Sequence, residues 1–312
     1  PSTLGAPVCS TNGGAAFIVG IIHLAFDSGK GKKMKMKKLG VVLAAGVLAA
    51  SLALFGCSSN SSSSDTKKDD SSAKTEATAS GYTLVKDGTL IMGTSPDYPP
   101  FENLENGEAV GFDVDLCKAI ADELGLKFEV KSLQFDGIIP AVVAGGQCDL
   151  GMAGMSVDPD RAKEVDFTDS YYVDDQAIAT MKSNTAITSD NAKEELNKAG
   201  VIIAVQSGTT GESYCQENFP NATIQPYGNS TDAFAAMQAG QANAVCTNSA
   251  VVKKMLADAY SDAQVVMQVA TGEEYAIAVS KDNPELTKAI NEAIKKLNDN
   301  GTVEQLASKW LG

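Results

Sequence analysis

From residue 82 to the end of the chain, short apolar runs alternate with segments of helical hydrophobic spacing, and no other feature restricts the fold as strongly. Such alternation is typical of α/β proteins, in which helices cover a sheet. The predicted strands cover residues 89–93, 127–130, 148–153, 201–205, 223–226, 243–247 and 275–280. The predicted helices cover residues 114–124, 137–144, 230–239, 249–257, 284–297 and 302–310, and a further helix opens at 207–211.

The pattern runs through two similar units and then closes with one more strand and two helices. We predict two lobes, each a doubly wound sheet, with residues 82–172 plus 273–312 in lobe 1 and residues 173–272 in lobe 2. The chain would cross between the lobes twice, and the crossings would act as a hinge. Ligands of such sheets bind beyond the carboxyl ends of the strands, so the expected site is a cleft between the lobes.

Charge and the scarcity of two residue types exclude several functions. The chain has 25 Lys and Arg against 39 Asp and Glu, a net charge of −14, which argues against a nucleic-acid partner. The one histidine, His23, lies in an N-terminal part that we expect to be removed. Without an imidazole the working protein cannot use Ser-His-Asp or Cys-His catalysis or His-ligated zinc, so we expect no metal and no cofactor.

The N-terminal part of the chain carries signals of export. Residues 1–33 are expected to be upstream sequence, with the natural start at Met34 or Met36. Lysines then precede an apolar run over 39–55, which is short for a membrane span. A basic start followed by such a run predicts a signal peptide over 34–56.

The end of this apolar run resembles the lipobox of bacterial lipoproteins. It reads Leu-Phe-Gly-Cys at 54–57, which would make Cys57 the lipid-modified first residue and would anchor an extracytoplasmic protein to the cell membrane. The alternative is a membrane anchor helix with a chance cysteine. Residues 57–81 are rich in serine, and 58–80 contain no large apolar side chain, so we expect a flexible tether.

The cysteines of the folded part leave two readings open. They are Cys117, Cys148, Cys215 and Cys246. Four cysteines allow three disulfide pairings, and export permits disulfides. Each one also sits in an apolar stretch where a buried thiol is equally natural.

Arg161 is the sole arginine of the chain and follows the third predicted strand. The helix that opens at 207–211 would face it across the cleft with free N–H groups. A guanidinium opposite a helix N-terminus is suited to clamp a carboxylate. The alternative is that Arg161 only pairs with Asp158, Asp160 or Glu164 on the surface. Tyr98 and Phe135 also follow lobe 1 strands, where they would flank an organic ligand or simply pack within their loops.

Six motifs make the chain resemble the family 3 solute-binding proteins of bacterial amino-acid ABC importers. They are GTSPDYPPFE (93–102), GFDVDL (111–116), FDGIIPAV (135–142), MAGMSVDPDR (152–161), VDFTDSYY (165–172) and SGTTG (207–211). The resemblance implies a two-lobe, type II periplasmic-binding-protein-like fold. It also implies a monomeric binding protein, not an enzyme, that delivers an amino acid to an ABC permease.

The resemblance also implies roles for individual residues. Arg161 would bind the α-carboxylate of the ligand, helped by Ser156 and Thr210. Gly154 and Ser156 would meet its α-ammonium. The rings of Tyr98 and Phe135 would sandwich its side chain.

Two positions depart from the family pattern. Asn248 stands where the family usually has an Asp that pairs with the α-ammonium. Asp97 or another acid would then compensate, or affinity would be modest, or the ligand would lack a free α-ammonium. Ser95 stands where members that bind basic or glutamine side chains often have Asp, which argues against lysine, arginine and histidine and favours a polar or neutral amino acid.

Two other functions remain open at this point. A dehydratase-like enzyme on the same scaffold would need a general acid or base in the cleft, and Asp97 and Glu102 are the candidates. A ligand-sensing module would require that the protein continue into a membrane helix or a kinase.

Overall fold

The structure is a computed structural model and describes residues 81–312. The expected upstream segment 1–33, the signal peptide over 34–56, the lipidation site Cys57 and the tether up to residue 80 lie outside the described residues. None of the helices within 81–312 combines the length and apolar character that a membrane-spanning helix needs.

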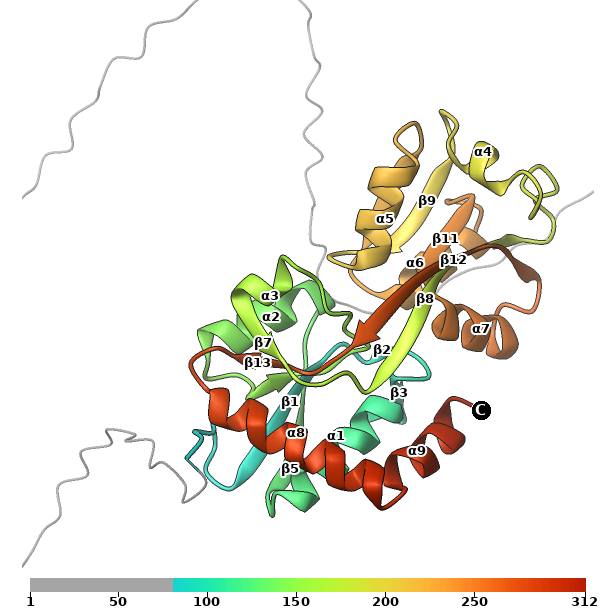
Figure 1. Cartoon of the computed structure of the whole chain (residues 1–312). Coiled ribbons are helices and arrows are strands. Elements are labelled where there is room, and N and C mark those ends of the chain that lie inside the picture. Colours follow the sequence, from blue (N-terminus) through green and yellow to red (C-terminus); the bar gives the residue numbers. More distant parts are fainter. Residues whose placement is uncertain (1–80) are drawn as a thin grey trace, which may run out of the picture. The chain divides into compact units, whose positions relative to one another are not determined.

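The first of two large sheets is mixed and has five strands (Figure 1). In spatial order they are β5 (Lys127–Ser132), β1 (Thr89–Thr94), β6 (Leu150–Gly151), β13 (Ala278–Ser280) and β7 (Val165–Phe167). The strands β5, β1 and β6 are parallel, whereas β13 runs antiparallel to both its neighbours. We refer to this sheet and its helices as lobe 1.

Helices cover both faces of the lobe 1 sheet. They are α1 (Phe112–Glu123), α2 (Phe135–Ala144), α3 (Arg161–Glu164), α8 (Pro284–Asp299) and α9 (Thr302–Trp310). Leu116 and Ile120 of α1 share one apolar core with Ile290 of α8, while Ile138 and Val142 of α2 belong to a separate core. Two cores on opposite faces are expected when a sheet is doubly wound.

The second large sheet and its helices form what we name lobe 2. Its strands, in spatial order, are β10 (Thr223–Tyr227), β9 (Ile202–Gln206), β11 (Ala244–Asn248), β8 (Tyr172–Met181) and β12 (Ala263–Tyr275). Its helices are α4 (Ala192–Leu196), α5 (Thr210–Asn218), α6 (Ser230–Gln238) and α7 (Ser249–Asp258). Along β9, Ile203 and Val205 join the core that contains Cys215 of α5, whereas Ala204 joins the core that contains Phe234 of α6. This alternation follows from the two-residue period of a strand.

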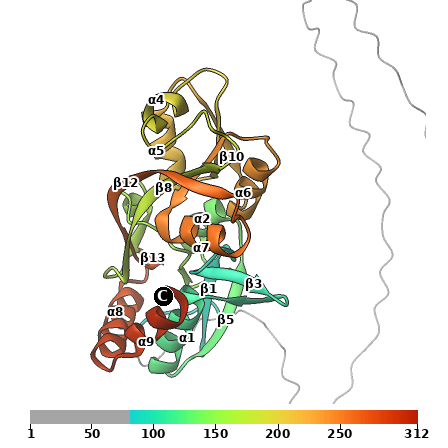
Figure 2. The ribbon, with the colours of Figure 1, turned by 90° about the vertical axis from the view of Figure 1, so that its right-hand side faces the viewer.

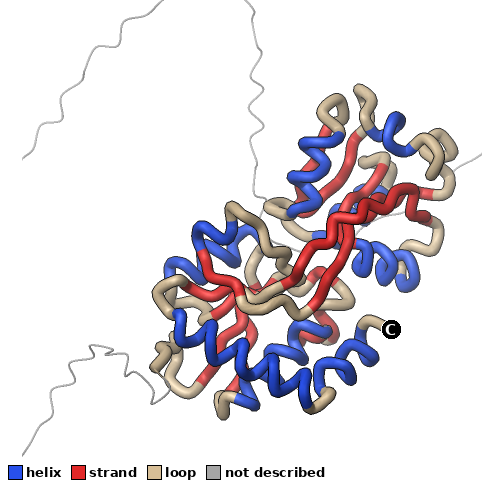
Figure 3. The backbone as a smooth tube through the Cα atoms, in the orientation of Figure 1, coloured by secondary structure: helices blue, strands red, loops and turns tan. Residues whose placement is uncertain are grey.

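Two long strands carry the chain between the lobes. β8 and β12 pair antiparallel and run side by side from lobe 1 into lobe 2 (Figures 1 and 3). At the lobe 1 end, Asp174 pairs with Glu273 and Tyr172 pairs with Tyr275. The two crossings are therefore parts of one hydrogen-bonded ribbon.

A three-stranded sheet extends lobe 1 beside the cleft. It consists of β2 (Asp97–Tyr98), β3 (Glu102–Glu105) and β4 (Glu108–Val110), and Figure 2 shows β3 extending away from the rest of lobe 1. The strand β2 contacts α6 of lobe 2. This small sheet holds Tyr98 at the boundary between the lobes.

Several elements differ from the sequence prediction. The strands β8 and β12 and the hairpin β3–β4 were not predicted, and the strand expected over 148–153 shortens to β6. The helix expected over 137–144 begins at Phe135, so Pro140 lies beyond its first turn, where it removes one backbone hydrogen bond. The four cysteines of the described range are free and buried, which confirms the thiol reading.

Candidate ligand-binding site

A small cavity lies where the two lobes face each other. Its volume is about 10 Å³, which is room for about one water molecule. It is lined by Tyr98, Phe135, Gly154, Ser156, Arg161, Gln206, Thr209, Thr210 and Asn248. All seven binding residues expected from the sequence are in this set, whereas Gln206 and Thr209 were not predicted. Gln206 directly precedes the motif at 207–211 and Thr209 lies within it, and these positions were a signal that could have found both residues.

Arg161 begins α3, and its guanidinium reaches across the cleft. Nη1 donates to the carbonyl of Ser156 in lobe 1 at 2.8 Å, and Nη2 donates to the carbonyl of Gly208 in lobe 2 at 2.9 Å. The guanidinium carbon lies 5.2 Å from the centre of the Phe135 ring, which is within the range of a cation–π contact. The planar group therefore joins both lobes beside the cavity.

Surface ion pairing does not account for Arg161. Among residues 81–312, no carboxylate forms an ion pair with its guanidinium. Asp158 instead accepts from the backbone N–H of Arg161 at 3.1 Å. Burial lowers the pKa of Arg161, although Asp158 and Glu273 act in the opposite direction. A guanidinium stays charged in proteins, so the cleft holds a buried cation.

The N-terminus of α5 faces the cavity from lobe 2. Thr209 is its N-cap, and the Thr209 hydroxyl accepts from the N–H of Glu212 at 3.1 Å. The Glu212 carboxylate in turn accepts from the N–H of Gly208 at 2.8 Å. This reciprocal arrangement resembles a capping box and fixes the first turn of the helix. Thr210, the first residue of α5, is thereby held at the wall of the cavity.

Tyr98 closes the cavity from the side of lobe 1. Its hydroxyl lies 2.8 Å from Oγ1 of Thr247 and donates to Oδ1 of Asn248 at 2.6 Å, both in lobe 2. Gly154 has φ +51°, and a Cβ there would lie 3.1 Å from the Tyr98 ring. Only glycine combines that backbone conformation with such close contact to the ring.

Glu273 is a functional candidate that the sequence reasoning missed. Its carboxylate, at the crossing on β12, accepts from the hydroxyls of Ser156 and Thr210 and from the side-chain amides of Gln176 and Asn248. Burial would raise the pKa of Glu273, but these four hydrogen bonds lower it below its usual value. The carboxylate is therefore ionised. Acidic residues directly before the predicted strand at 275–280 were the only signal for it.

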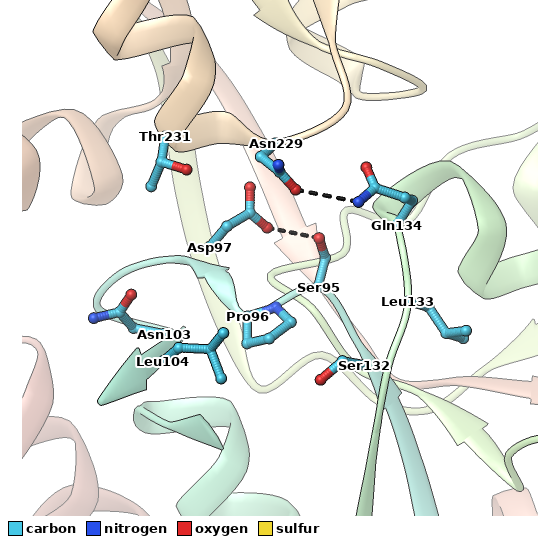
Figure 4. Close-up of a pocket in the computed structure, with 10 residues that line it drawn as sticks. All are labelled: Ser95, Pro96, Asp97, Asn103, Leu104, Ser132, Leu133, Gln134, Asn229 and Thr231. Atoms are coloured by element: carbon cyan, nitrogen blue, oxygen red, sulfur yellow. Dashed lines mark hydrogen bonds between the residues drawn. The ribbon is translucent and has the colours of Figure 1, made fainter. Parts of the chain in front are cut away.

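A wider pocket of about 620 Å³ opens at the edge of the cleft (Figure 4). The buried carboxylate of Asp97 lines it and accepts from the Ser95 hydroxyl at 2.6 Å, from the Ser230 N–H and from Nε2 of Gln206 at 3.2 Å. Burial raises the pKa of Asp97, and these hydrogen bonds oppose that change. Gln206 lines the inner cavity and donates to Asp97 in the wall of the wider pocket, so it connects the two sites.

The chemistry of this cleft is that of recognition by hydrogen bonds. Its walls offer hydroxyls, amides and one guanidinium around two aromatic rings, and the Glu273 carboxylate accepts hydrogen bonds from three of the lining residues. Within the part of the chain that the structure describes, no cluster of His, Cys, Asp and Glu could hold a metal ion. A concave site with a few convergent polar groups binds and orients a small organic molecule.

The fold and the cleft define a two-lobe α/β binding protein. The family model for bacterial extracellular solute-binding proteins, family 3, matches residues 90–312. The chain belongs to this family. The resemblance drawn from the motifs and the predicted two-lobe fold are both confirmed.

Curated relatives and a solved structure agree with this assignment. The arginine-binding extracellular protein ArtP of Bacillus subtilis is 33% identical over 88% of this chain and 98% of its own length. The ABC transporter glutamine-binding protein GlnH of Bacillus subtilis is 32% identical over 85% of this chain and 94% of its own. The ancestral amino acid-binding protein AncCDT-1, a precursor of cyclohexadienyl dehydratase, is 39% identical over 72% of this chain and 96% of that one, with a TM-score of 0.67. The relatives are solute-binding proteins of amino-acid ABC transporters, which favours the predicted binding protein over an enzyme.

Proposed function

We propose that the protein is the extracytoplasmic substrate-binding lipoprotein of an ABC importer and binds a polar, neutral amino acid between its lobes. One observation carries the proposal. The guanidinium of Arg161 and the N-terminus of α5 line the same small cavity from opposite lobes. A planar cation and free helix N–H groups form a site for a carboxylate, and the hydroxyls of Ser156 and Thr210 add two donors.

The groups around the cavity support a neutral side chain. Gln206 and Thr209 contribute an amide and a hydroxyl, and none of the nine lining residues is acidic. Relatives include proteins named for arginine and for glutamine, so both ligand types occur among them. A basic amino acid is the second candidate, because the carboxylate of Asp97 lines the adjoining pocket and could receive a cationic end.

Binding would be coupled to closure of the cleft. Lobe 1 supplies Tyr98, Phe135, Gly154, Ser156 and Arg161 and would bind the ligand first. Lobe 2 gains its contacts, through Thr210 and Asn248, only when the lobes meet. A ligand that contacts both lobes binds the closed form more tightly and shifts the hinge equilibrium toward it.

The remaining parts of the proposal concern location and partners. Cys57 would carry the lipid anchor, residues 57–81 would tether a monomeric binding domain, and the ABC permease would receive the loaded, closed form. Expression with a clickable palmitate analogue tests the anchor. Label is expected on the wild-type protein and absent from Cys57→Ala, and label on both would rule out this anchor.

A thermal-shift screen of the full chain against the twenty common amino acids and cystine tests the ligand class. A ligand that binds only the native state raises the melting temperature, by several degrees at about 100 times its Kd. L-glutamine is expected to give a larger shift than L-arginine, and the reverse order would favour the basic candidate. No shift with any amino acid would overturn the proposed function.

A further inference from the structure

The cavity between the lobes has a cation in its wall and an anion directly behind it. Arg161 is the only charged residue among the nine that line the cavity. Glu273 hydrogen-bonds to three of those nine, namely Ser156, Thr210 and Asn248. The negative charge therefore lies one hydrogen bond away from a cavity whose wall carries the positive charge, and this pair of charges is complementary to a zwitterion.

The Glu273 carboxylate is held by donors from both lobes. Oε2 accepts from Oγ of Ser156 at 2.5 Å, from Oγ1 of Thr210 at 2.7 Å and from Nδ2 of Asn248 at 3.2 Å. Oε1 accepts from Nε2 of Gln176 at 2.8 Å and from Oγ1 of Thr271 at 3.1 Å. Five donors hold the group in place and keep it ionised.

We propose that Glu273 is the carboxylate that binds the α-ammonium of the ligand, and that Asn248 orients it. This inference rests on the proposed function and adds a specificity determinant to it. Glu273 lies on the ribbon that connects the lobes. Its charge is therefore close to the cavity, although Glu273 is not one of the residues that line it.

The side chain of Asn248 explains why an amide suits this position. Its Oδ1 accepts from the hydroxyl of Tyr98 at 2.6 Å, which directs its Nδ2 to Glu273. A carboxylate at position 248 would lie against Glu273 as a second negative charge, and like charges at that distance disfavour ionisation. The amide at 248 and the acid at 273 are therefore complementary.

An exchange of hydrogen bonds lets the ligand enter. The hydroxyls of Ser156 and Thr210 can each donate one hydrogen bond, and without a ligand both donate it to Glu273. When a ligand carboxylate arrives beside Arg161, both hydroxyls turn toward it. The N–H groups of the ammonium then replace them on Oε2, so each donor lost by Glu273 is regained.

Calorimetry with matched ligands tests this assignment. The titrants are L-glutamine and glutaramic acid, which is the same molecule without the α-ammonium, and L-arginine with 5-guanidinopentanoic acid in parallel. Glu273→Gln is expected to weaken the amino acid by about 10- to 100-fold, as for the loss of a charged hydrogen bond, and to change the des-amino acid little. The exposed neighbour provides the matched control, and Glu274→Gln should leave both affinities unchanged.

A double variant that exchanges the acid and the amide between positions 273 and 248 is the second part of the experiment. The double variant Glu273→Gln/Asn248→Asp is expected to recover most of the affinity for the amino acid, because one carboxylate again faces the ammonium. Circular dichroism of each variant checks that it is folded.

Each outcome decides a separate point. If the wild type binds neither amino acid, the proposed ligand class fails and this inference fails with it. If the wild type binds but Glu273→Gln binds equally well or more tightly, Glu273 is a stand-in for the ligand carboxylate, and only this inference falls. An equal loss for the amino acid and its des-amino analogue would assign Glu273 a purely structural role and would also overturn it.

Discussion

Arg161 donates to carbonyl oxygens of both lobes, and two of its five N–H groups are used in this way. A lysine could not make the same contacts, because its ammonium is a point charge without a planar fork. Every other residue in the Lys and Arg count of the chain is a lysine. The geometry of this one site therefore accounts for the single arginine.

Arg161→Ala is expected to weaken amino-acid binding by about 100-fold or more, because it removes a bidentate, charge-assisted pair. Isothermal titration calorimetry measures the effect. Lys163→Ala is the control, since Lys163 lies on the same short helix and forms an exposed ion pair with Asp160. Equal amino-acid affinities of Arg161→Ala and Lys163→Ala would contradict the proposal that Arg161 binds the ligand carboxylate.

Glu102 and Asp113 form a buried carboxyl pair behind the cleft. Asp113 accepts from the N–H of Gly154 at 2.7 Å and from the hydroxyl of Tyr171 at 2.8 Å, and so supports the loop that carries Gly154. Burial raises the pKa of Asp113 to about 6. Burial and the neighbouring Asp113 raise the pKa of Glu102 well above its usual value, and neither Glu102 oxygen has another hydrogen-bond partner within the described range.

Glu102→Gln is expected to gain stability relative to the wild type as the pH rises from 5 to 8. An acid with a raised pKa binds more protons in the folded state, so its contribution is full below the unfolded pKa and is lost as the pH rises toward the folded pKa. The amide mimics the protonated acid and escapes this loss, which amounts to at most about 1.4 kcal/mol per pH unit. Urea unfolding at both pH values measures the difference, with the exposed Glu105→Gln as control. If the difference in the free energy of unfolding between Glu102→Gln and the wild type does not increase with pH, Glu102 does not have a raised pKa in the folded protein.

At the scale of elements, the first turn of α5 does two things at once. Its N-cap contacts, between Thr209 and Glu212 and between Glu212 and Gly208, fix the turn. Thr209 and Thr210 of the same turn line the cavity. Stability and the proposed binding therefore depend on the same turn.

Thr209→Ala is expected to lower the free energy of unfolding by about 1 kcal/mol, because it removes an N-cap. Chemical denaturation measures this. Thr287→Ala in α8 is the matched control, since the buried hydroxyl of Thr287 has no hydrogen-bond partner among residues 81–312. A larger loss in the control than in Thr209→Ala would mean that the cap contributes little.

The sequence predicted the elements with strong local signals. Apolar runs gave β1, β9 and β11, and the motif at 207–211 gave the start of α5. The long strands β8 and β12 were missed, because β12 mixes Gly272, Glu273 and Glu274 into its length and its pairing is a tertiary event. Glu273 was missed for the same reason: its role comes from the ribbon that places it, which no local pattern encodes.

At the scale of the whole molecule, hydrogen bonds between side chains join the lobes at several places around the cleft. Tyr98 bonds to Asn248 on the inside, Ser207 donates to Asp136 at 3.1 Å, and Gln134 donates to Asn229 at 3.3 Å, as Figure 4 shows for the last pair. Within residues 81–312, the chain crosses between the two sheets only through the paired strands β8 and β12. Closure is thus held by contacts that can separate while the ribbon stays intact.

Tyr98→Phe is expected to favour the open form, because it keeps the ring but removes the hydroxyl that bonds to lobe 2. Each net hydrogen bond contributes about 1 kcal/mol, and the hydroxyl contacts Thr247 and Asn248, so amino-acid affinity should fall by about 5- to 30-fold. Small-angle X-ray scattering should give a larger radius of gyration without ligand than for the wild type. Tyr171→Phe is the control, as its hydroxyl bonds to Asp113 within lobe 1. Identical scattering from both variants would argue against the Tyr98 contact as a latch.

The strand order of lobe 1 has a consequence for the biogenesis of the protein. β13, from residues 278–280, sits between β6 and β7, so the sheet is joined only after nearly all of the chain has been made. Lobe 2 draws its five strands from one uninterrupted stretch, residues 172–275. The half that comes second in the gene is thus finished first during translation or export. Lobe 1 must wait, with one edge of β6 unpaired and β7 separate from the sheet, until residues 278–280 arrive.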